Sequence, residues 1–207
     1  LTDYHFSPTE NSQKNLLNEG VDESSIFITG NTVIDALKLV INRIGNDEFL
    51  KLSIEKTIAQ SGFEELNSKF ILVTGHRREN FGQGFLNICE ALKVLAEHNP
   101  EINILYPVHL NPNVRRPVNE LLSNTSNIKL VEPFQYEEFV YIMSKSYLIL
   151  TDSGGIQEEA PSLGKPVLVM RDSTERPEAV EAGTVRLVGS SRDNIIKEVQ
   201  SLLHDSG

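Results

Sequence analysis

The chain has 207 residues, 39% of them hydrophobic, and carries a formal net charge of −10 at pH 7. This length can bury a sizeable core, either as one domain with an appendage or as two small domains. The acidic balance argues against non-specific binding of nucleic acid, which depends on clustered Lys and Arg side chains that neutralise phosphates.

Cysteine content and hydropathy narrow the class further. Cys89 is the single cysteine, which excludes an intramolecular disulfide and a cysteine-based zinc site. No apolar run approaches the ~20 residues of a membrane span, and the start shows no signal-peptide pattern. We therefore expect a cytoplasmic protein without a membrane partner. Because the chain starts at Leu1 rather than at a methionine, a piece of a longer protein is also compatible with the sequence.

The first part of the chain predicts a small βαβ-like segment followed by two helices. Strand-like residues at 4–6, a helical pattern over 11–18 and an apolar run at 26–28 make up the segment. Apolar residues then recur at helical spacing over 33–44 and again over 50–58. We interpret residues 1–31 as separate from a main domain that comprises residues 32–207.

From residue 70 onward, short apolar runs alternate with helical patterns. Runs that are apolar at successive positions suit strands buried on both faces, and their alternation with helices indicates a parallel sheet. The sequence therefore predicts an α/β fold with a doubly wound, Rossmann-like sheet of six strands. The expected strands are 70–73, 102–106, 128–131, 147–150, 167–170 and 185–188, and the expected helices are 85–97, 114–123, 137–145, 156–163, 178–182 and 193–203.

The topology predicts where a ligand would bind. In the common strand order 3-2-1-4-5-6, the crevice lies outside the carboxyl ends of the first and fourth strands. Those two strands are followed by residues 74–84 and 152–155, which are the most polar and glycine-rich turns of the chain. We therefore expect these two loops to face each other.

The turn Ser153-Gly154-Gly155 joins a predicted strand to a predicted helix. Adjacent glycines allow a ligand to approach the backbone, and the N–H groups of a helix's first turn attract anions. The alternative is an ordinary tight turn between a strand and a helix. Pro161 lies inside the expected helix and should kink or shorten it.

Basic side chains follow the first strand of the crevice. A protonated His76 could donate a proton to a departing phosphate oxygen, whereas the alternative is a surface histidine. Arg77 and Arg78 could bind phosphate, or they could form ion pairs with Glu79 or another acid. His109 also ends a strand, and it either contacts the crevice or caps the following helix.

Three further residues have competing interpretations. By spacing alone, Phe139 belongs to the core stripe of its helix. Glu159 could accept hydrogen bonds from two ribose hydroxyls or could be a solvated helix residue. Arg176 could reach the phosphates bound at the crevice. The sequence contains no HExxH, Walker or GxSxG motif, and residues 75–84 do not fit GxGxxG, so neither a metal nor a cofactor such as NAD is expected.

Four motifs, in order along the chain, give the sequence a specific resemblance. The motifs are Gly75-His76-Arg77-Arg78-Glu79-Asn80, Tyr106-Pro107-Val108-His109-Leu110-Asn111-Pro112, Asp152-Ser153-Gly154-Gly155-Ile156-Gln157-Glu158-Glu159-Ala160 and Thr174-Glu175-Arg176-Pro177-Glu178. They closely resemble the motifs of the non-hydrolysing bacterial UDP-N-acetylglucosamine 2-epimerases. The match covers essentially the whole chain, but only the second half of that family's two-domain, glycosyltransferase-B-like architecture.

The resemblance implies an isomerase that inverts C2 of the sugar, giving UDP-N-acetylmannosamine for cell-surface polysaccharides. UDP is eliminated to leave a glycal and is then added back to the other face. It further implies that the amides of Ser153, Gly154 and Gly155, together with Arg176, hold the phosphates of UDP or a UDP-N-acetylhexosamine. Glu159 takes the ribose.

The remaining residue roles also come from the resemblance. It implies that Phe139 lies by the uracil, which replaces the core interpretation, and that His76 contacts the leaving group as a catalytic residue. Arg77, Glu79 and His109 match positions that line a second, activating site for substrate. The full-length enzyme is expected to be a homodimer.

The resemblance also implies what this chain lacks. The family's proton-transferring carboxylates lie in its first domain, of which residues 1–31 resemble only the last strands and the crossover. We therefore expect the chain alone to bind UDP weakly without epimerising it. The alternatives are a glycosyltransferase-B-type transferase, a hydrolysing epimerase and a stand-alone nucleotide-binding module.

Overall fold

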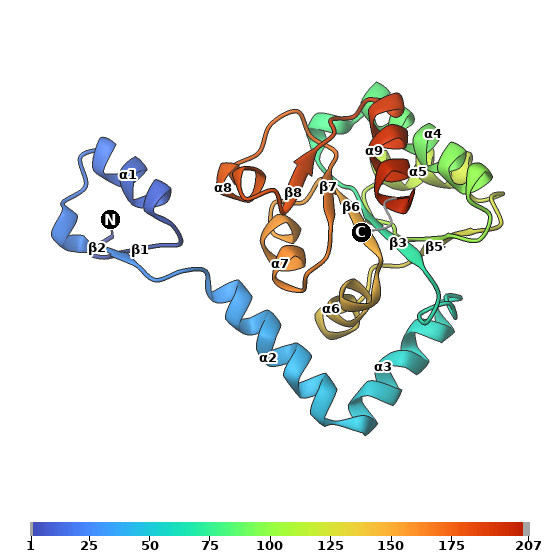
Figure 1. Cartoon of the computed structure of the whole chain (residues 1–207), viewed down its shortest axis with the longest axis horizontal. Coiled ribbons are helices and arrows are strands. Elements are labelled where there is room, and N and C mark those ends of the chain that lie inside the picture. The colour runs from blue at the N-terminus through green and yellow to red at the C-terminus, as the bar shows by residue number, and fades with distance from the viewer. Residues whose placement is uncertain (1, 205–207) are drawn as a thin grey trace. The chain divides into compact units, whose positions relative to one another are not determined.

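The computed structural model describes residues 2–204 (Figure 1). The chain divides into two compact units, residues 1–39 and residues 40–207. Helix α2 (Thr32–Asn46) spans the division between them. No helix among the described residues is long and apolar enough to cross a membrane. The expected domain boundary at residue 31 and its interpretation remain predictions.

The first unit contains the expected βαβ segment. Strands β1 (His5–Ser7) and β2 (Ile26–Ile28) pair in parallel, and α1 (Glu10–Asn18) connects them, followed by the short 3₁₀ helix η1 (Glu23–Ser25). The hydroxyl of Thr9 accepts the Ser12 N–H at the start of α1, which satisfies one of the free donors of a first helical turn.

In the second unit, α3 (Glu48–Gln60) begins at Asp47, whose side chain accepts the Leu50 N–H. Helix α3 is attached to α6 (Tyr136–Lys145) through a 2.6 Å hydrogen bond from the Tyr141 hydroxyl to Glu55. The chain then enters the sheet through Phe63, whose ring contacts Phe70 edge-on at a centroid distance of 5.1 Å.

The sheet has six parallel strands in the order β5-β4-β3-β6-β7-β8, which is the predicted order 3-2-1-4-5-6. The prediction of a doubly wound parallel sheet is therefore confirmed. The strands are β3 (Phe70–Thr74), β4 (Asn103–Pro107), β5 (Ile128–Val131), β6 (Leu148–Thr151), β7 (Val167–Val169) and β8 (Val185–Leu187).

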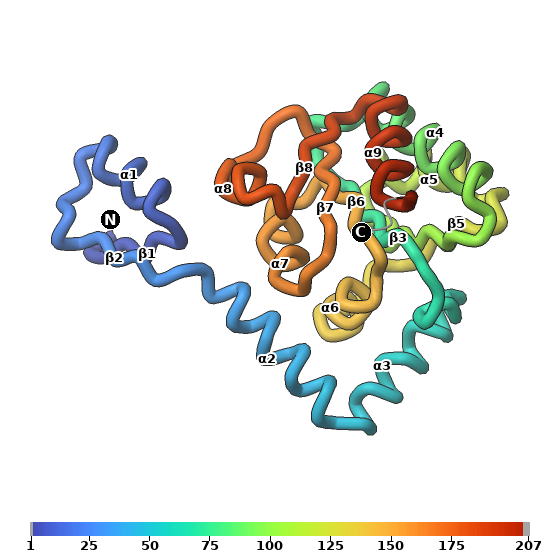
Figure 2. The backbone as a smooth tube through the Cα atoms, viewed as in Figure 1, coloured from blue at the N-terminus to red at the C-terminus, as the bar shows by residue number. Residues whose placement is uncertain are grey.

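Helices alternate with these strands, as the backbone tube of Figure 2 shows. Every expected helix is present, and the bounds differ by only one or two residues. The helices that complete the unit are η2 (Arg78–Asn80), α4 (Gln83–His98), α5 (Pro112–Leu122), α7 (Ile156–Ser162), α8 (Pro177–Glu181) and α9 (Arg192–His204).

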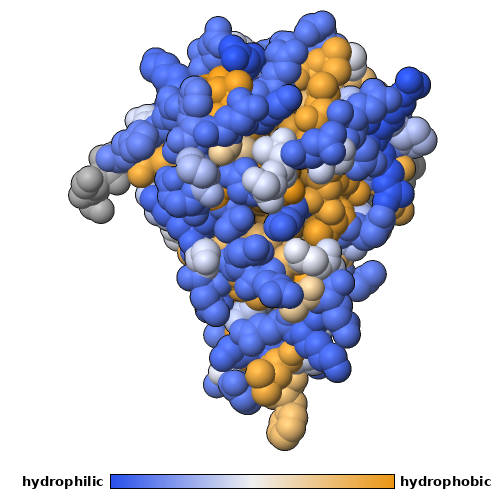
Figure 3. Space-filling view, turned by 90° about the vertical axis from the view of Figure 1, so that its right-hand side faces the viewer, coloured by the Kyte–Doolittle hydropathy of each residue, from blue (hydrophilic) through white to orange (hydrophobic). Residues whose placement is uncertain are grey.

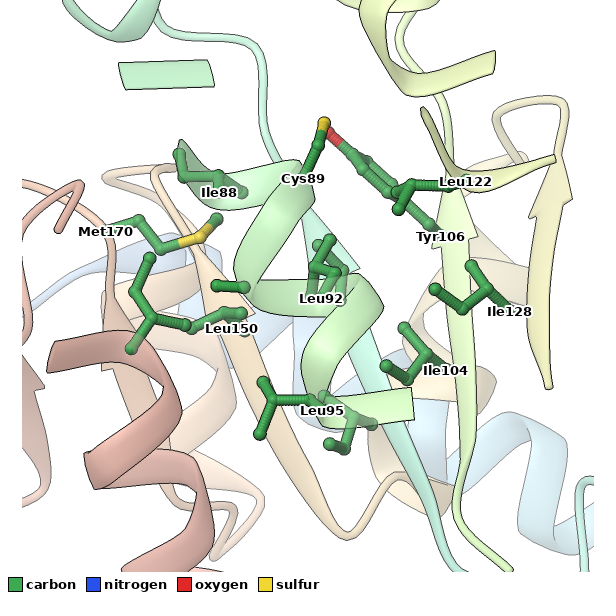
Figure 4. Packing of buried hydrophobic residues seen from close by; sticks show 14 of the residues in the cluster. Ile88, Cys89, Leu92, Leu95, Ile104, Tyr106, Leu122, Ile128, Leu150 and Met170 are labelled. Atoms are coloured by element: carbon green, nitrogen blue, oxygen red, sulfur yellow. The ribbon is translucent and has the colours of Figure 1, made fainter. Parts of the chain in front are cut away.

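The main core lies between the sheet and the layer of α4, α5 and α9 (Figure 4). Residues of α4 such as Leu92 pack against Ile104 of β4 and Leu150 of β6. Ile71 belongs to this cluster, whereas the side chain of its neighbour Phe70 contacts Phe63 on the other face of the sheet. Successive side chains of a strand point to opposite faces. Both faces of the sheet are therefore covered.

Cys89 is fully buried in this core, as the sequence predicts. Burial, with a smaller effect from the charge of Glu90, raises the pKa of the Cys89 thiol to about 12. On the face of the molecule in Figure 3, polar side chains predominate, with hydrophobic groups between them. This pattern agrees with the burial of most large apolar side chains in the core.

Candidate functional site

The two polar loops meet at the carboxyl ends of β3 and β6, as the strand order predicts. The hydroxyls of Thr74 and Thr151, the last residues of these strands, are 2.6 Å apart. The Thr151 hydroxyl oxygen also accepts the Ser153 N–H at 2.9 Å. The turn after β6 is thereby fixed to the end of β3.

Asp152 is the central residue of the rim. Its side chain is fully buried and accepts the backbone N–H groups of His76 at 3.0 Å and Arg77 at 2.9 Å, together with the Asn80 side-chain amide at 3.2 Å. The same amide of Asn80 donates to the Met170 carbonyl at 3.1 Å. Asp152 therefore holds the loop after β3 in place, and through Asn80 that loop is joined to the end of β7.

His76 and His109 lie together at the crevice. The rings stack with centroids 5.5 Å apart and an interplanar angle of 21°. His76 Nδ1 is 3.3 Å from the Asp152 carboxylate, and the side chain is 40% exposed, so Nε2 is the nitrogen that can meet a ligand. The alternative that His109 caps the next helix is wrong, because Asn111 caps α5, and His109 Nδ1 accepts the Asn111 N–H at 3.1 Å.

Two arginines and two glutamates form an ionic cluster beside the histidines. Arg171, which lies two residues after the end of β7 and is only 8% exposed, donates to Glu79 and to Glu175, each at 2.5 Å. Arg77 Nη2 donates to the other oxygen of Glu175 at 3.2 Å. Burial opposes the charge of Arg171, but the hydrogen bonds and charges of the two glutamates outweigh that effect and raise its pKa above the ordinary value. Of the two interpretations of Arg77, phosphate binding or an ion pair, the structure shows an ion pair. Its partner is Glu175 rather than Glu79.

The glycine turn lies against this cluster. A Cβ atom on Gly154 would be 2.5 Å from a Glu175 carboxylate oxygen and 3.2 Å from Arg77 Nη2, so a larger residue would require these two side chains to move. Among residues 2–204, the N–H groups of Gly154 and Gly155 have no hydrogen-bond partner, whereas that of Ser153 is bound to Thr151. Helix α7 has only seven residues and ends one residue after Pro161, which confirms the expected shortening.

Glu159 lies on α7 and is only 9% exposed, so its interpretation as a solvated helix residue is wrong. The Tyr136 hydroxyl donates to its carboxylate at 3.1 Å. Burial raises the pKa of Glu159 above its ordinary value, and the hydrogen bond from Tyr136 opposes part of that shift. A buried carboxylate that receives a single hydrogen bond is well suited to accept further hydrogen bonds from ligand hydroxyls.

Arg176 precedes α8 and is attached to the glycine-turn helix. The guanidinium of Arg176 forms an ion pair with Glu158, and the backbone N–H of Arg176 donates to the Thr174 hydroxyl at 3.0 Å. That hydroxyl donates to Gln157 at 2.5 Å. Phe139 is partly buried on α6, whereas the next residue, Val140, is fully buried, so Phe139 lies at the margin of the core rather than inside it.

Sequence reasoning did not single out Asn80, Tyr136, Arg171 or Glu175 as residues of the site. Their partners lie far away in the chain: 92 residues separate Arg171 from Glu79. A usable signal existed for Arg171, because it directly follows a predicted strand at the same sheet edge as His76. Glu175 carried no such signal, since only the folded loop places it over Gly154.

The fold and the site together define a doubly wound α/β domain whose carboxyl edge gathers arginines, histidines and free backbone donors. A family model described as UDP-N-acetylglucosamine 2-epimerase matches residues 1–207, and the chain belongs to this family.

Individual relatives agree with this assignment. The UDP-N-acetylglucosamine 2-epimerase of Campylobacter jejuni is 62% identical over 205 residues, which are 99% of this chain and 54% of the relative. The crystal structure of the Neisseria meningitidis enzyme bound to UDP-GlcNAc matches with a TM-score of 0.92 at 51% identity, over 99% of this chain and 54% of that one. The Methanocaldococcus jannaschii enzyme in complex with UDP-GlcNAc and UDP matches at 0.83 and 34% identity, over 99% and 55%.

The chain therefore spans about half the length of the curated relatives it matches. The match to these structures confirms the glycosyltransferase-B-like fold class expected from the resemblance.

Proposed function

We propose that this chain is the nucleotide-binding half of a UDP-N-acetylglucosamine 2-epimerase. In this proposal the whole protein interconverts UDP-N-acetylglucosamine and UDP-N-acetylmannosamine. The observation that carries the proposal is that the Gly154 turn, Glu159 and Arg176 lie together at the carboxyl edge of the sheet. Solved structures of related proteins contain UDP-GlcNAc and UDP.

The nucleotide would lie along α7. The N–H groups of Gly154 and Gly155 have no internal partner among residues 2–204 and can donate to the diphosphate, while Arg176 supplies the positive charge. The N–H of Ser153 is already bonded to Thr151, so its contribution requires that bond to change. Glu159, held by Tyr136, accepts the ribose hydroxyls, and Phe139 offers its partly buried ring to the uracil.

The chemistry explains why a diphosphate site matters to an epimerase. The sugar C2–H has no neighbouring carbonyl to acidify it, so the bond from C1 to the diphosphate oxygen must break as the proton leaves C2. UDP departs with the electron pair of that bond, a glycal remains, and re-addition to the other face completes the inversion. The largest electrostatic task is to stabilise the leaving diphosphate, and the proposal assigns it to His76 Nε2 and the arginines of this sheet edge.

The activating site expected at Arg77, Glu79 and His109 is part of the same proposal. Its support is proximity: His109 stacks on His76, and Arg77 reaches the Gly154 turn. The proposed activating site and the proposed UDP site are therefore in direct contact. The homodimer and the use of the product in cell-surface polysaccharides also belong to the proposal and rest on the resemblance alone. The cytoplasmic location belongs to it as well and rests on the hydropathy of the sequence.

The chain alone is expected to bind UDP without turning it over. The carboxylates that move the C2 proton in the family match no position of this sequence. Asp152 is not a substitute, because it is fully buried and accepts hydrogen bonds from three residues of the loop after β3.

Calorimetric titration with UDP tests the proposal. We expect Arg176→Ala and Glu159→Ala each to weaken binding by about 1 kcal/mol or more, roughly fivefold to tenfold. Arg186→Ala is the matched control, since Arg186 lies on β8 and pairs with Glu198 away from the turn. Absence of binding at millimolar UDP, or equal weakening by the control, would contradict the proposed site.

A further inference from the structure

The carboxylate of Glu175 occupies a position at the carboxyl edge of the sheet where two arginines could bind an anion. We use the term anion seat for the position formed by Gly154, Arg77 and Arg171. The carboxylate of Glu175 lies in it: one oxygen is 3.2 Å from Arg77 Nη2 and within 2.5 Å of where a Cβ of Gly154 would be. The other oxygen accepts from Arg171 at 2.5 Å.

The occupant makes incomplete use of the donors around it. Arg77 Nε is buried, and within the described residues it has no hydrogen-bond partner. A buried guanidinium N–H without an acceptor is uncommon, because each unpaired donor costs free energy. A carboxylate offers two oxygens, whereas a phosphate group offers three and a diphosphate more. The seat is therefore better matched to a phosphate than to the side chain that lies in it.

The charges of the seat also balance. Arg77 and Arg171 face Glu175 and Glu79, so two positive charges meet two negative ones. A ligand phosphate that approached with Glu175 in place would meet a like charge at contact distance, which is unfavourable. Binding at this position therefore requires the Glu175 carboxylate to leave.

Departure is feasible because the Glu175 side chain is 40% exposed. The carboxylate can turn into water and regain its hydration, while Arg171 keeps its bond to Glu79. The Glu175 side of this ion pair is open to solvent, where charges are screened, whereas Arg171 stays buried against Glu79. Asp152 has no such option, since it is fully buried.

We propose that Glu175 is an internal anion that sets ligand specificity: its carboxylate fills the anion seat and is displaced by a phosphate group of the ligand. This proposal deepens the proposed function and rests on it for the nucleotide. Anions with enough charge to compete for Arg77 and Arg171 displace Glu175. Ligands with a single phosphate compete poorly, and uncharged ligands do not compete at all.

The test is a set of calorimetric titrations with UDP, UMP, uridine and inorganic pyrophosphate. Each is added to the wild-type chain, to Glu175→Gln and to the control Glu181→Gln, which removes the same charge from an exposed residue of α8. We expect Glu175→Gln to bind UDP and pyrophosphate about threefold to fivefold more tightly, and uridine unchanged. The UMP affinity should approach that of UDP more closely than in the wild-type chain.

Several outcomes would contradict the proposal that a ligand phosphate displaces Glu175. Weaker UDP binding by Glu175→Gln would mean that the carboxylate supports the site. Equal tightening by Glu181→Gln would show a general charge effect, and a gain for uridine would show a change unrelated to phosphate.

Pyrophosphate separates this proposal from the proposed function. Tightened pyrophosphate binding without any UDP binding would contradict the nucleotide site alone, whereas unchanged pyrophosphate affinity would contradict the internal anion alone. Circular dichroism of each variant checks that the fold is retained.

Discussion

Two carboxylates at the same sheet edge are held in opposite ways. Asp152 has no exposed surface and accepts backbone N–H groups from His76 and Arg77, which are fixed as soon as the chain folds. Glu175 is 40% exposed and is held by the flexible side chains of Arg77 and Arg171. The donors around a carboxylate, rather than its type, therefore decide whether it is a permanent part of the architecture or an exchangeable partner.

Asp152→Asn tests the permanent side of this comparison most directly. The amide has the same shape, but its NH₂ group would face donors, so buried N–H groups lose their acceptor. We expect the free energy of unfolding to fall by about 3 kcal/mol in urea titrations. Asp193→Asn is the control, because that side chain is 86% exposed and should cost less than about 1 kcal/mol. Equal losses in the two variants would contradict the central role of Asp152.

Glu159 lies between the two cases, since it is buried but receives one hydrogen bond from the Tyr136 side chain. Burial raises its pKa above the ordinary 4.5, so the folded state retains the proton to higher pH than the unfolded state. The stability that this provides is present below the unfolded pKa and is lost as pH rises through the folded pKa.

Tyr136→Phe removes a hydrogen bond that favours the ionised carboxylate, so it should raise the Glu159 pKa further. We expect a loss of about 1 kcal/mol in unfolding free energy at pH 7 and a smaller loss below the pKa of Glu159. Urea unfolding across this pH range measures the difference. In a Glu159→Gln background the pH dependence of the Tyr136→Phe effect should vanish, and its persistence would assign it to another group.

The two adjacent glycines should respond with opposite signs. Gly155 has the helical angles φ −64° and ψ −41°, and an added Cβ would meet nothing within 4 Å. Gly155→Ala should therefore stabilise the chain by about 0.5 kcal/mol. Gly154→Ala should destabilise it by a similar amount, because its Cβ displaces the Glu175 carboxylate. Thermal unfolding of both variants would show this difference, and equal shifts would contradict the close approach at Gly154.

Glu175→Gln should have the smallest effect on stability. Because the side chain is exposed to solvent screening, we expect a loss below about 0.5 kcal/mol at pH 7. Burial would raise the pKa of Glu175, but hydrogen bonds from its own backbone and from Arg171, with the charges of Arg171 and Arg77, lower it. The stability of these ion pairs is thus present above the unfolded pKa and lost as pH falls through the folded pKa. Unfolding in high salt should remove the difference between the variant and the wild type.

The sequence predicted the sheet well because its signals are local. Each buried strand carries its own apolar run, and the topology rule then brought the loops of His76 and Gly154 together before any side-chain partner was known. Partner choice was not predictable, since it depends on side chains that meet only in the folded chain. Arg77 could have paired with Glu79, which is two residues away, yet it pairs with Glu175, while Glu79 pairs with Arg171.

The single thiol of the chain makes the stability of its core measurable in a simple way. Cys89 lies fully buried between α4 and the sheet, and its high pKa keeps it protonated. A thiol reagent can therefore modify it only when α4 separates from the strands. The rate of modification then reports how often that layer opens, and a ligand that tightens the sheet edge would slow the same reaction without touching the thiol.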